Sequence, residues 1–328
     1  MTQALNYTVK ALDDLMALRD AATTAPADKA GVDFIIGKLR QAEVFLMPDY
    51  GMLLDRSKPR PEVPGQLYRP PFPIVALEYQ SADPSWAASS AFDAAPSSKR
   101  IALAWEWDGS LPVGMTTPPE MEVGQGVFVA SVSYYDALGC WVPTGTAALI
   151  PYEAAYAIPK PSAYRSEMVK AGRVPAAVAN AASMVIDEMM MILPVSMARL
   201  VQMNGPEMAV QMFSADLMDE VNAYCDLAIA LQCTNVSSER HPQPEKLNRS
   251  RAKAGKPALK AFHVLKIAGQ GDGGGTPFGG RASGLRSHLR RGHVRRLAPD
   301  RITWVNACMV RGSRPGFADK HYTLPGAA

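Results

Sequence analysis

The chain of 328 residues is long enough for two domains and at least one sizeable hydrophobic core. Hydrophobic residues make up 48% of it and charged residues 20%, which excludes fibrous and intrinsically disordered proteins. The net charge of +3 is the balance of two unlike parts, because residues 237–328 hold 18 basic and 5 acidic side chains and residues 1–236 hold 16 and 26. This asymmetry indicates either polyanion binding by the basic part or neutralisation of the two parts across an internal interface.

Compartment and membrane contact follow from simple sequence features. The N-terminal residues lack the apolar stretch of a signal peptide, and no apolar run approaches the ~20 residues that span a bilayer. The four cysteines form no CxxC pair, which favours buried thiols in a reducing compartment. We therefore expect a cytoplasmic protein without membrane contact.

Hydrophobic residues spaced three and four apart predict helices in two parts of the chain. The first pair is expected within residues 3–47, over 3–22 and from Asp28, a candidate N-cap, to about residue 47. The strongest helical pattern covers residues 176–234, where Pro194 interrupts the first helix and an Asn-Gly-Pro turn precedes the second. These methionine-rich helices are typical of a core, and they also fit a homodimer interface or a groove for a host protein.

Residues 72–151 have the pattern of a β-rich insert in this helical part. Short runs of β-branched and aromatic residues alternate there with Gly, Pro, Ser and Asp. The turn at 136–139 predicts a hairpin between the last two runs. The proline-rich residues 58–73, which precede the insert, favour an extended connector.

The basic part is expected to consist of a linker and a small β module. Residues 237–258 are polar, proline-punctuated and basic, which predicts a linker. The module follows over residues 259–328, with a flexible glycine-rich loop at 269–284. Its strands are expected at 259–267, 286–297, 301–311 and 319–324, with a hairpin turn at 298–300. The whole protein is therefore predicted to be α+β: an acidic domain over residues 1–236, a linker, and a basic β-sheet module.

Arginine and histidine concentrate in the expected hairpin. Guanidinium groups hold two phosphate oxygens at once, and an aromatic ring can stack on a base, so the hairpin predicts an RNA or DNA interface. The predicted nucleic-acid-binding residues are Arg286, Arg290, Arg291, Arg295, Arg296, Lys253, Lys256 and Trp304. Trp304 also fits a core position, which is the commoner role of a tryptophan in a strand.

Two alternatives to simple nucleic-acid binding remain open. His288 and His293 beside arginines suit a metal-independent ribonuclease, in which one imidazole takes a proton and the other gives one. An interaction protein that blocks a host factor through residues 176–234 is the third hypothesis. The spacing of His288, His293, Cys308 and His321 matches no common zinc pattern, so neither a metal nor a cofactor is expected.

The C-terminal segment also resembles a protein family. An HLRRGHxR element stands ahead of a Trp-Val strand and after a basic GKP segment, and it looks like the C-terminal region of uncharacterised bacteriophage and prophage proteins. The matching positions are Lys256-Pro257, His263, His288 to Arg295, and Trp304-Val305. The resemblance covers about residues 246–324 and implies a phage or mobile-element origin, with a site of action in the cytoplasm of the infected bacterium.

Overall fold

The computed structural model describes residues 4–54, 68–81, 97–115, 123–152, 156–157, 183–184, 189–268, 286–290, 293–298, 301–305, 308–310 and 314–317. The helices in these ranges are α1 (Tyr7–Asp20), α2 (Pro26–Gln41), the short η1 (Asp49–Gly51), α4 (Pro194–Asn204), α5 (Pro206–Leu231) and α6 (Glu245–Lys253). The strands up to α5 are β1 (Glu43–Leu46), β2 (Ile74–Gln80), β3 (Ser97–Glu106), β4 (Gly126–Tyr135), β5 (Cys140–Pro151), β6 (Tyr156–Ala157), β7 (Ser183–Met184) and β8 (Met189–Met191). Those after α5 are β9 (Val236–His241), β10 (Phe262–Ile267), β11 (Arg286–Arg290), β12 (His293–Ala298), β13 (Arg301–Val305), β14 (Cys308–Val310) and β15 (Arg314–Phe317).

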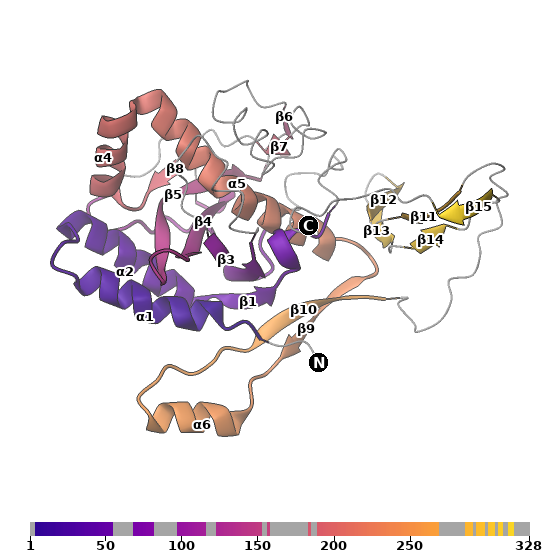
Figure 1. Cartoon of the computed structure of the whole chain (residues 1–328), viewed down its shortest axis with the longest axis horizontal. Coiled ribbons are helices and arrows are strands. Elements are labelled where there is room, and N and C mark those ends of the chain that lie inside the picture. The colour runs from indigo at the N-terminus through magenta and orange to yellow at the C-terminus, as the bar shows by residue number, and fades with distance from the viewer. Residues whose placement is uncertain are drawn as a thin grey trace.

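An eight-stranded mixed sheet forms the centre of the molecule, with the strand order β8-β5-β4-β3-β2-β1-β10-β9. Strand β1 is parallel to both of its neighbours, β2 and β10, and the other pairs are antiparallel. Helices α1 and α2 pack on one face of this sheet and α5 packs on the other (Figure 1). The fold is therefore α+β, as the sequence predicts.

The central strands are buried on both faces. In β2, Ile74 and Ala76 belong to the core under α1 and α2, whereas Val75 and Leu77 belong to the core under α5. Successive side chains of a strand point to opposite faces, so a strand covered on both sides reads as a continuous apolar run. This explains why the strand pattern of residues 72–151 is strong, and the four predicted runs are confirmed as β2, β3, β4 and β5.

Three further sequence predictions are confirmed. The helix expected over 3–22 is α1, and the second of the helices expected within 176–234 is α5. The turn at 136–139 joins β4 and β5, which pair as an antiparallel hairpin. Gly139 has a φ of 66°, a left-handed conformation that glycine adopts without steric strain.

The second predicted helix is wrong at both ends. Helix α2 stops at Gln41 and the chain continues as β1, so residues 43–46 are a strand. Pro26 occupies the first turn and Ala25 is the N-cap, with no side-chain capping bond. Asp28 instead caps a different helix: its carboxylate accepts hydrogen bonds from the backbone N–H groups of Val195 (2.9 Å) and Ser196 (3.1 Å) at the start of α4. Because α2 packs beside the start of α4, the Asp28 carboxylate caps α4 and not its own helix.

The helix expected over residues 176–203 is also shorter than predicted. Residues 189–191 form β8, which pairs with β5, and the helix begins only at Pro194. Proline suits the first turn of a helix because its missing N–H has no intrahelical partner there. Residues 176–182 and 185–188 lie outside the described part of the chain.

The predicted linker over residues 237–258 is replaced by ordered elements. It contains β9 and α6, and β9 pairs antiparallel with β10. The strand predicted at 259–267 is confirmed as β10, but it joins β1 in the large sheet and does not start a separate C-terminal sheet. Residues 44 and 262 are thereby direct neighbours in the sheet.

The C-terminal hairpin is confirmed between β12 and β13, which pair from His293↔Val305 to Ala298↔Arg301. Strand β11 pairs with β14 and β15 in a second small sheet. The strands predicted at 286–297 and 301–311 therefore each contribute to two sheets: β11 and β14 pair in one, and β12 and β13 pair in the other. The predicted strand at 319–324 and the loop at 269–284 lie outside the described residues.

In the ranges given above, no helix combines the length with the apolar composition that crossing a membrane requires.

Candidate nucleic-acid interface

The residues between β9 and β10 form a projection that we name the basic arm, residues 242–261. The arm holds six Lys and Arg side chains and one carboxylate, Glu245. In Figure 1 its helix, α6, stands away from the sheet and from α1 and α2. One third of the 18 basic side chains of residues 237–328 thus lie on a small projecting element.

Lys260 fixes the arm to the main body. Its Nζ atom donates hydrogen bonds to the backbone carbonyls of Leu39 (2.8 Å), Arg40 (2.9 Å) and Ala42 (2.7 Å). These carbonyls lie at the C-terminal end of α2, where they lack intrahelical partners and where the helix dipole favours a cation. Burial lowers the pKa of Lys260, although the carboxylates of Glu43 and Glu78 oppose that shift. This lysine acts as a structural cap and does not belong to the exposed charge.

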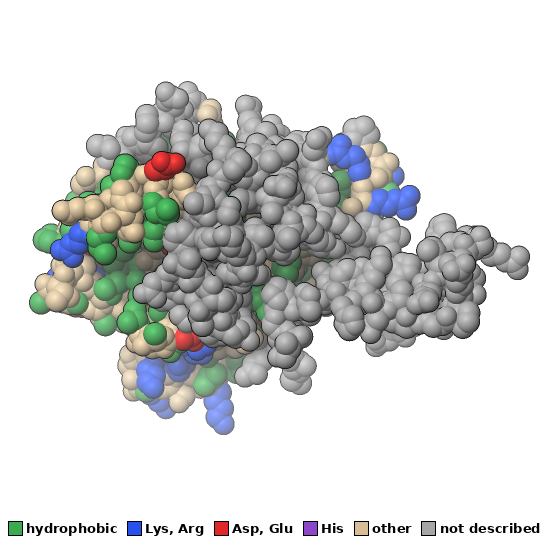
Figure 2. Space-filling view, turned by 45° about the horizontal axis from the view of Figure 1, so that its top comes forward, with side chains coloured by type: hydrophobic (Ala, Val, Ile, Leu, Met, Phe, Trp, Pro, Cys, Tyr) green, Lys and Arg blue, Asp and Glu red, His purple; other side chains and the backbone are tan. Residues whose placement is uncertain are grey.

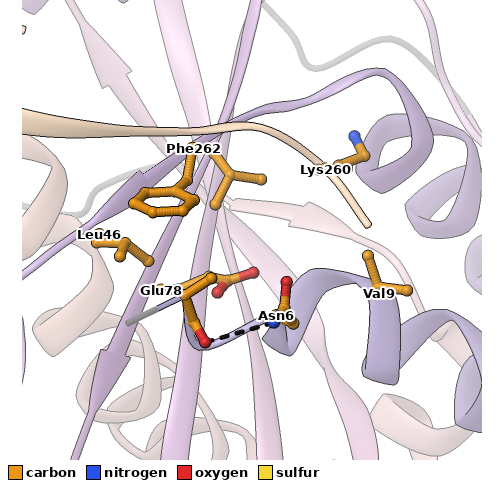
Figure 3. A pocket seen from close by; sticks show the side chains of 8 residues that line it. Asn6, Val9, Leu46, Glu78, Lys260 and Phe262 are labelled. Atoms are coloured by element: carbon orange, nitrogen blue, oxygen red, sulfur yellow. Dashed lines mark hydrogen bonds between the residues drawn. The ribbon is translucent and has the colours of Figure 1, made fainter. Parts of the chain in front are cut away.

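Figure 3 shows the base of the arm, where Phe262 lies over a cavity of about 10 Å³ near Asn6 and Glu78. Such a volume holds about one water molecule. Glu78 is buried, and its Oε1 atom accepts a hydrogen bond of 2.7 Å from the backbone N–H of Thr8 in the first turn of α1. Burial raises the pKa of this carboxyl group. This small cavity therefore belongs to the joint between the arm and the main body.

One face of α6 is held by the rest of the arm. The side-chain amide of Asn248 exchanges two hydrogen bonds with the backbone of Leu259, at 3.0 and 2.8 Å. Arg251 Nε donates to the carbonyl oxygen of Pro257 at 2.7 Å. Asn248 and Arg251 are three residues apart and hence lie on the same side of the helix. This inward face orients α6 on the returning chain.

The opposite, outward face of α6 is basic. Lys246, Arg249 and Lys253 follow the spacing of three and four residues that places side chains on one side of a helix. All three side chains are exposed. We name Lys246, Arg249 and Lys253 the outward basic face.

Most of the exposed basic side chains of the arm have no carboxylate partner among the described residues. Arg249 pairs with Glu245 at 2.6 Å, an exposed i,i+4 ion pair. Lys246, Lys253 and Lys256 are exposed, and none of them forms an ion pair with a carboxylate in the described part of the chain. An exposed cation of this kind attracts phosphate groups and releases their counterions on binding.

The β12–β13 hairpin carries a second group of cations. Arg295, Arg296 and Arg301 are exposed. Figure 2 shows Lys and Arg side chains at the lower edge of the molecule, over α6, and at the upper right, over this hairpin. The two groups occupy separate places on this face.

Asn235, which follows α5, holds the hairpin on the main body. Its Oδ1 atom accepts hydrogen bonds from the backbone N–H of Trp304 (2.8 Å) and from Thr303 Oγ1 (3.0 Å). Its Nδ2 group donates to the carbonyl oxygen of Trp304 at 2.8 Å. Ile302 is buried in the core under α5. Asn235 and the buried Ile302 together therefore hold the strand that carries Trp304 on the main body.

Trp304 is partly buried, and its ring is one wall of an apolar groove of about 270 Å³. Strands β9 and β10 supply Val236 and Leu265 to the same groove. The ring packs against the core under α5. The structure thus assigns this tryptophan a packing role, and base stacking by Trp304 remains a prediction.

The predicted site residues differ in how far the structure describes them. Lys253, Lys256, Arg295 and Arg296 are exposed, as an interface requires. Arg286, His288 and Arg290 lie on β11 and His293 begins β12, but their side chains are outside the description, and Arg291 lies outside the described residues. Ribonuclease action by His288 and His293 therefore stays a prediction, as does a homodimer or host-protein contact through residues 176–234. Loss of cleavage in His288→Ala with binding retained would support the ribonuclease.

Lys246 and Arg249 were not among the residues predicted for the site. The sequence predicts a linker here because proline, glycine and polar residues surround these positions. The spacing of Lys246, Arg249 and Lys253 was the available signal, since basic residues at three and four positions apart indicate one face of a helix. No local pattern in the sequence pointed to Asn235 as the residue that positions the hairpin.

Across the described ranges, no group of three or more His, Cys, Asp or Glu side chains is arranged to hold a metal ion. Comparisons with protein-family models, with curated proteins and with solved structures found no match. The functional argument therefore depends on the geometry and charge of the chain itself.

Proposed function

We propose that this protein binds nucleic acid and that the outward basic face of α6 contacts the phosphate backbone. The observation that carries the proposal is that Lys246 and Lys253 are exposed and have no ion pair with any described carboxylate, on a helix whose opposite face is held by the arm. A basic helix presented in this way suits sequence-independent contact with phosphates.

Two further observations support the proposal. Arg295 and Arg301 on the hairpin are exposed, so a second cationic surface is available to a long polyanion. The alternative is that the basic part exists to neutralise the acidic part. The ion pairs of Lys266 with Glu239 and of Arg249 with Glu245 do not support it, because both carboxylates belong to residues 237–328 themselves. An ion pair that does join the two parts is His263 with Glu43 at 3.3 Å, and it requires a protonated imidazole. From the resemblance of residues 246–324 we also propose a phage or mobile-element origin and action in the bacterial cytoplasm.

Fluorescence anisotropy of the full-length chain with labelled RNA and DNA oligonucleotides tests the proposal. The double variant Lys246→Glu, Lys253→Glu is expected to weaken binding at least tenfold at low salt. It should also reduce the slope of log K against log salt by about 1.4 on single strands, that is, about 0.7 for each lost phosphate contact.

The matched control carries the same change in net charge elsewhere, as Lys29→Glu, Arg199→Glu on α2 and α4. It should retain most of the wild-type affinity and the wild-type salt slope. Equal loss of binding in both double variants would mean that only the overall charge matters and would contradict the assignment to α6. Absence of binding by the wild-type chain to any oligonucleotide at low salt would overturn the proposed function.

A further inference from the structure

A groove of about 380 Å³ lies between α1 and the basic arm. Val9, Lys10 and Asp13 line it from α1, and Arg251 and Lys256 line it from the arm. The three α1 residues follow helical spacing of one, three and four, so they share one side of that helix. The groove thus has one wall from the first helix of the chain and one from a segment some 240 residues later.

The turn after α6 forms the arm wall of this groove. Gly255 has a φ of 66° and follows the C-cap residue Ala254, and Lys256 N–H donates to the carbonyl oxygen of Arg251 at 2.9 Å. A left-handed glycine at this position reverses the chain at the end of a helix. The returning chain brings Lys256, Pro257 and Leu259 to face α1.

The groove combines an apolar surface with groups of both charges. Pro257, which is exposed, and Leu259, which is partly exposed, provide apolar surface. Lys10 and Lys256 are exposed and lie on opposite walls, and Lys10 Nζ also donates to the carbonyl oxygen of Leu5 at 3.3 Å. Asp13 is exposed and makes no hydrogen bond or ion pair that the described residues supply. A carboxylate between cations that it does not pair with is available as an acceptor for the amino group of a base.

We propose that this groove takes one unpaired nucleotide of a bound strand, with Lys10 and Lys256 on its phosphate and Asp13 accepting from a base amino group. The groove volume of about 380 Å³ is close to the lower limit of small-molecule pockets, which is about 300 Å³. A single nucleotide therefore fits, and a base-paired duplex does not. This inference rests on the proposed function, because the outward basic face of α6 delivers the strand to the groove. It adds a preference for single strands and for bases that carry an amino group.

The test compares oligonucleotides that have equal numbers of phosphates. Full-length protein is titrated with single-stranded oligodeoxycytidylate, with single-stranded oligodeoxythymidylate and with a fully paired hairpin duplex, each followed by anisotropy. Wild-type protein is expected to bind oligodeoxycytidylate best, because cytosine has an amino group and thymine has none. Lys10→Met should weaken single-strand binding about tenfold and leave duplex binding unchanged.

Asp13→Asn should remove the preference for cytidylate over thymidylate, since an amide can both donate to and accept from a base. Asp33→Asn on α2 removes the same charge outside the groove and should keep the preference. Equal binding of single strands and duplex by wild type, together with equal effects of Lys10→Met on both, would overturn the groove assignment and leave the proposed function standing. Failure of the wild-type chain to bind any of the three probes would refute the groove assignment, whereas the proposed function would be refuted only if the labelled RNA oligonucleotides also failed to bind.

Discussion

Gly31 and Gly37 both lie in α2, and the same substitution at the two positions should have opposite effects on stability. A Cβ atom added at Gly31 would lie 1.8 Å from the carbonyl oxygen of Ile192, whereas one added at Gly37 would meet no atom within 4 Å. Both glycines are inside a helix, where alanine is favoured by about 1 kcal/mol. The two variants therefore separate helix propensity from tertiary contact.

The size of the effect at Gly31 follows from how firmly the opposing backbone is held. Ile192 N–H and Leu193 N–H both donate to the carbonyl oxygen of Gly145, at 2.7 and 3.0 Å, and Asp28 binds the first turn of α4 just beyond. Relief of the clash requires these bonds to stretch or α2 to move away from β8. Overpacking of this kind costs about 1 to 3 kcal/mol, and each lost backbone hydrogen bond about 1 kcal/mol more.

After the gain in helix propensity is subtracted, we expect Gly31→Ala to destabilise the protein by about 2 to 4 kcal/mol, and Gly37→Ala to stabilise it by about 0.5 to 1 kcal/mol. Urea unfolding followed by the fluorescence of the buried Trp105 and Trp107 measures both values. A Gly31→Ala variant as stable as Gly37→Ala would refute the close approach of α2 to the segment before α4.

Three other predictions concern buried polar groups. Asp28→Ala should destabilise the protein by about 1 to 3 kcal/mol, because the N–H groups at the start of α4 lose their acceptor. Urea unfolding measures the change, and a loss of less than about 0.5 kcal/mol would contradict the capping role. Burial raises the pKa of Glu78 above its ordinary 4.5, so the folded state favours the protonated carboxyl group. The stability of wild type relative to Glu78→Gln should therefore fall as the pH rises from about 4.5 through the folded-state pKa. A stability difference that does not change with pH would contradict a raised pKa. Arg100→Met should destabilise the protein by about 3 to 5 kcal/mol, because Arg100 pairs with the buried carboxylate of Glu220 at 2.9 Å and its loss leaves that charge unpaired. Adding Glu220→Gln should restore part of the lost stability. If it restores none, the unpaired charge is not the cause of the destabilisation.

Prediction from sequence succeeded where local pattern carries the information. Helices α1 and α5 have apolar residues at helical spacing, and β2 to β5 have apolar runs bounded by turn residues. It failed at β1, because four residues that continue a helical pattern become a strand only by pairing with β2 and β10. It failed again over residues 237–258, where polar composition concealed a paired strand and a short helix.

The candidate site was predicted in outline. The charge difference between the two parts of the chain located the basic region, and Lys253 and Lys256, which the sequence predicts to bind nucleic acid, are exposed in the structure. Lys246, Arg249 and Lys253 share one face only if α6 forms. The formation of α6 depends in turn on the hydrogen bonds of Asn248 and Arg251 to the returning chain. A nine-residue helix is too short to be stable by propensity alone, so its existence could not be read from its own residues.

The main helices and strands, and with them the fold class, can be predicted from the chain because local hydrophobic patterns specify them, and the separation of acidic from basic charge is a matter of composition. Which groups meet depends on how the elements pack. Lys260 caps α2 from 220 residues away, Asp28 caps α4 across 168, and Glu78 binds the start of α1 across 70. These bonds form because unsatisfied N–H and C=O groups at helix ends need partners when they are buried, and the nearest partner in space is set by the packing of the sheet.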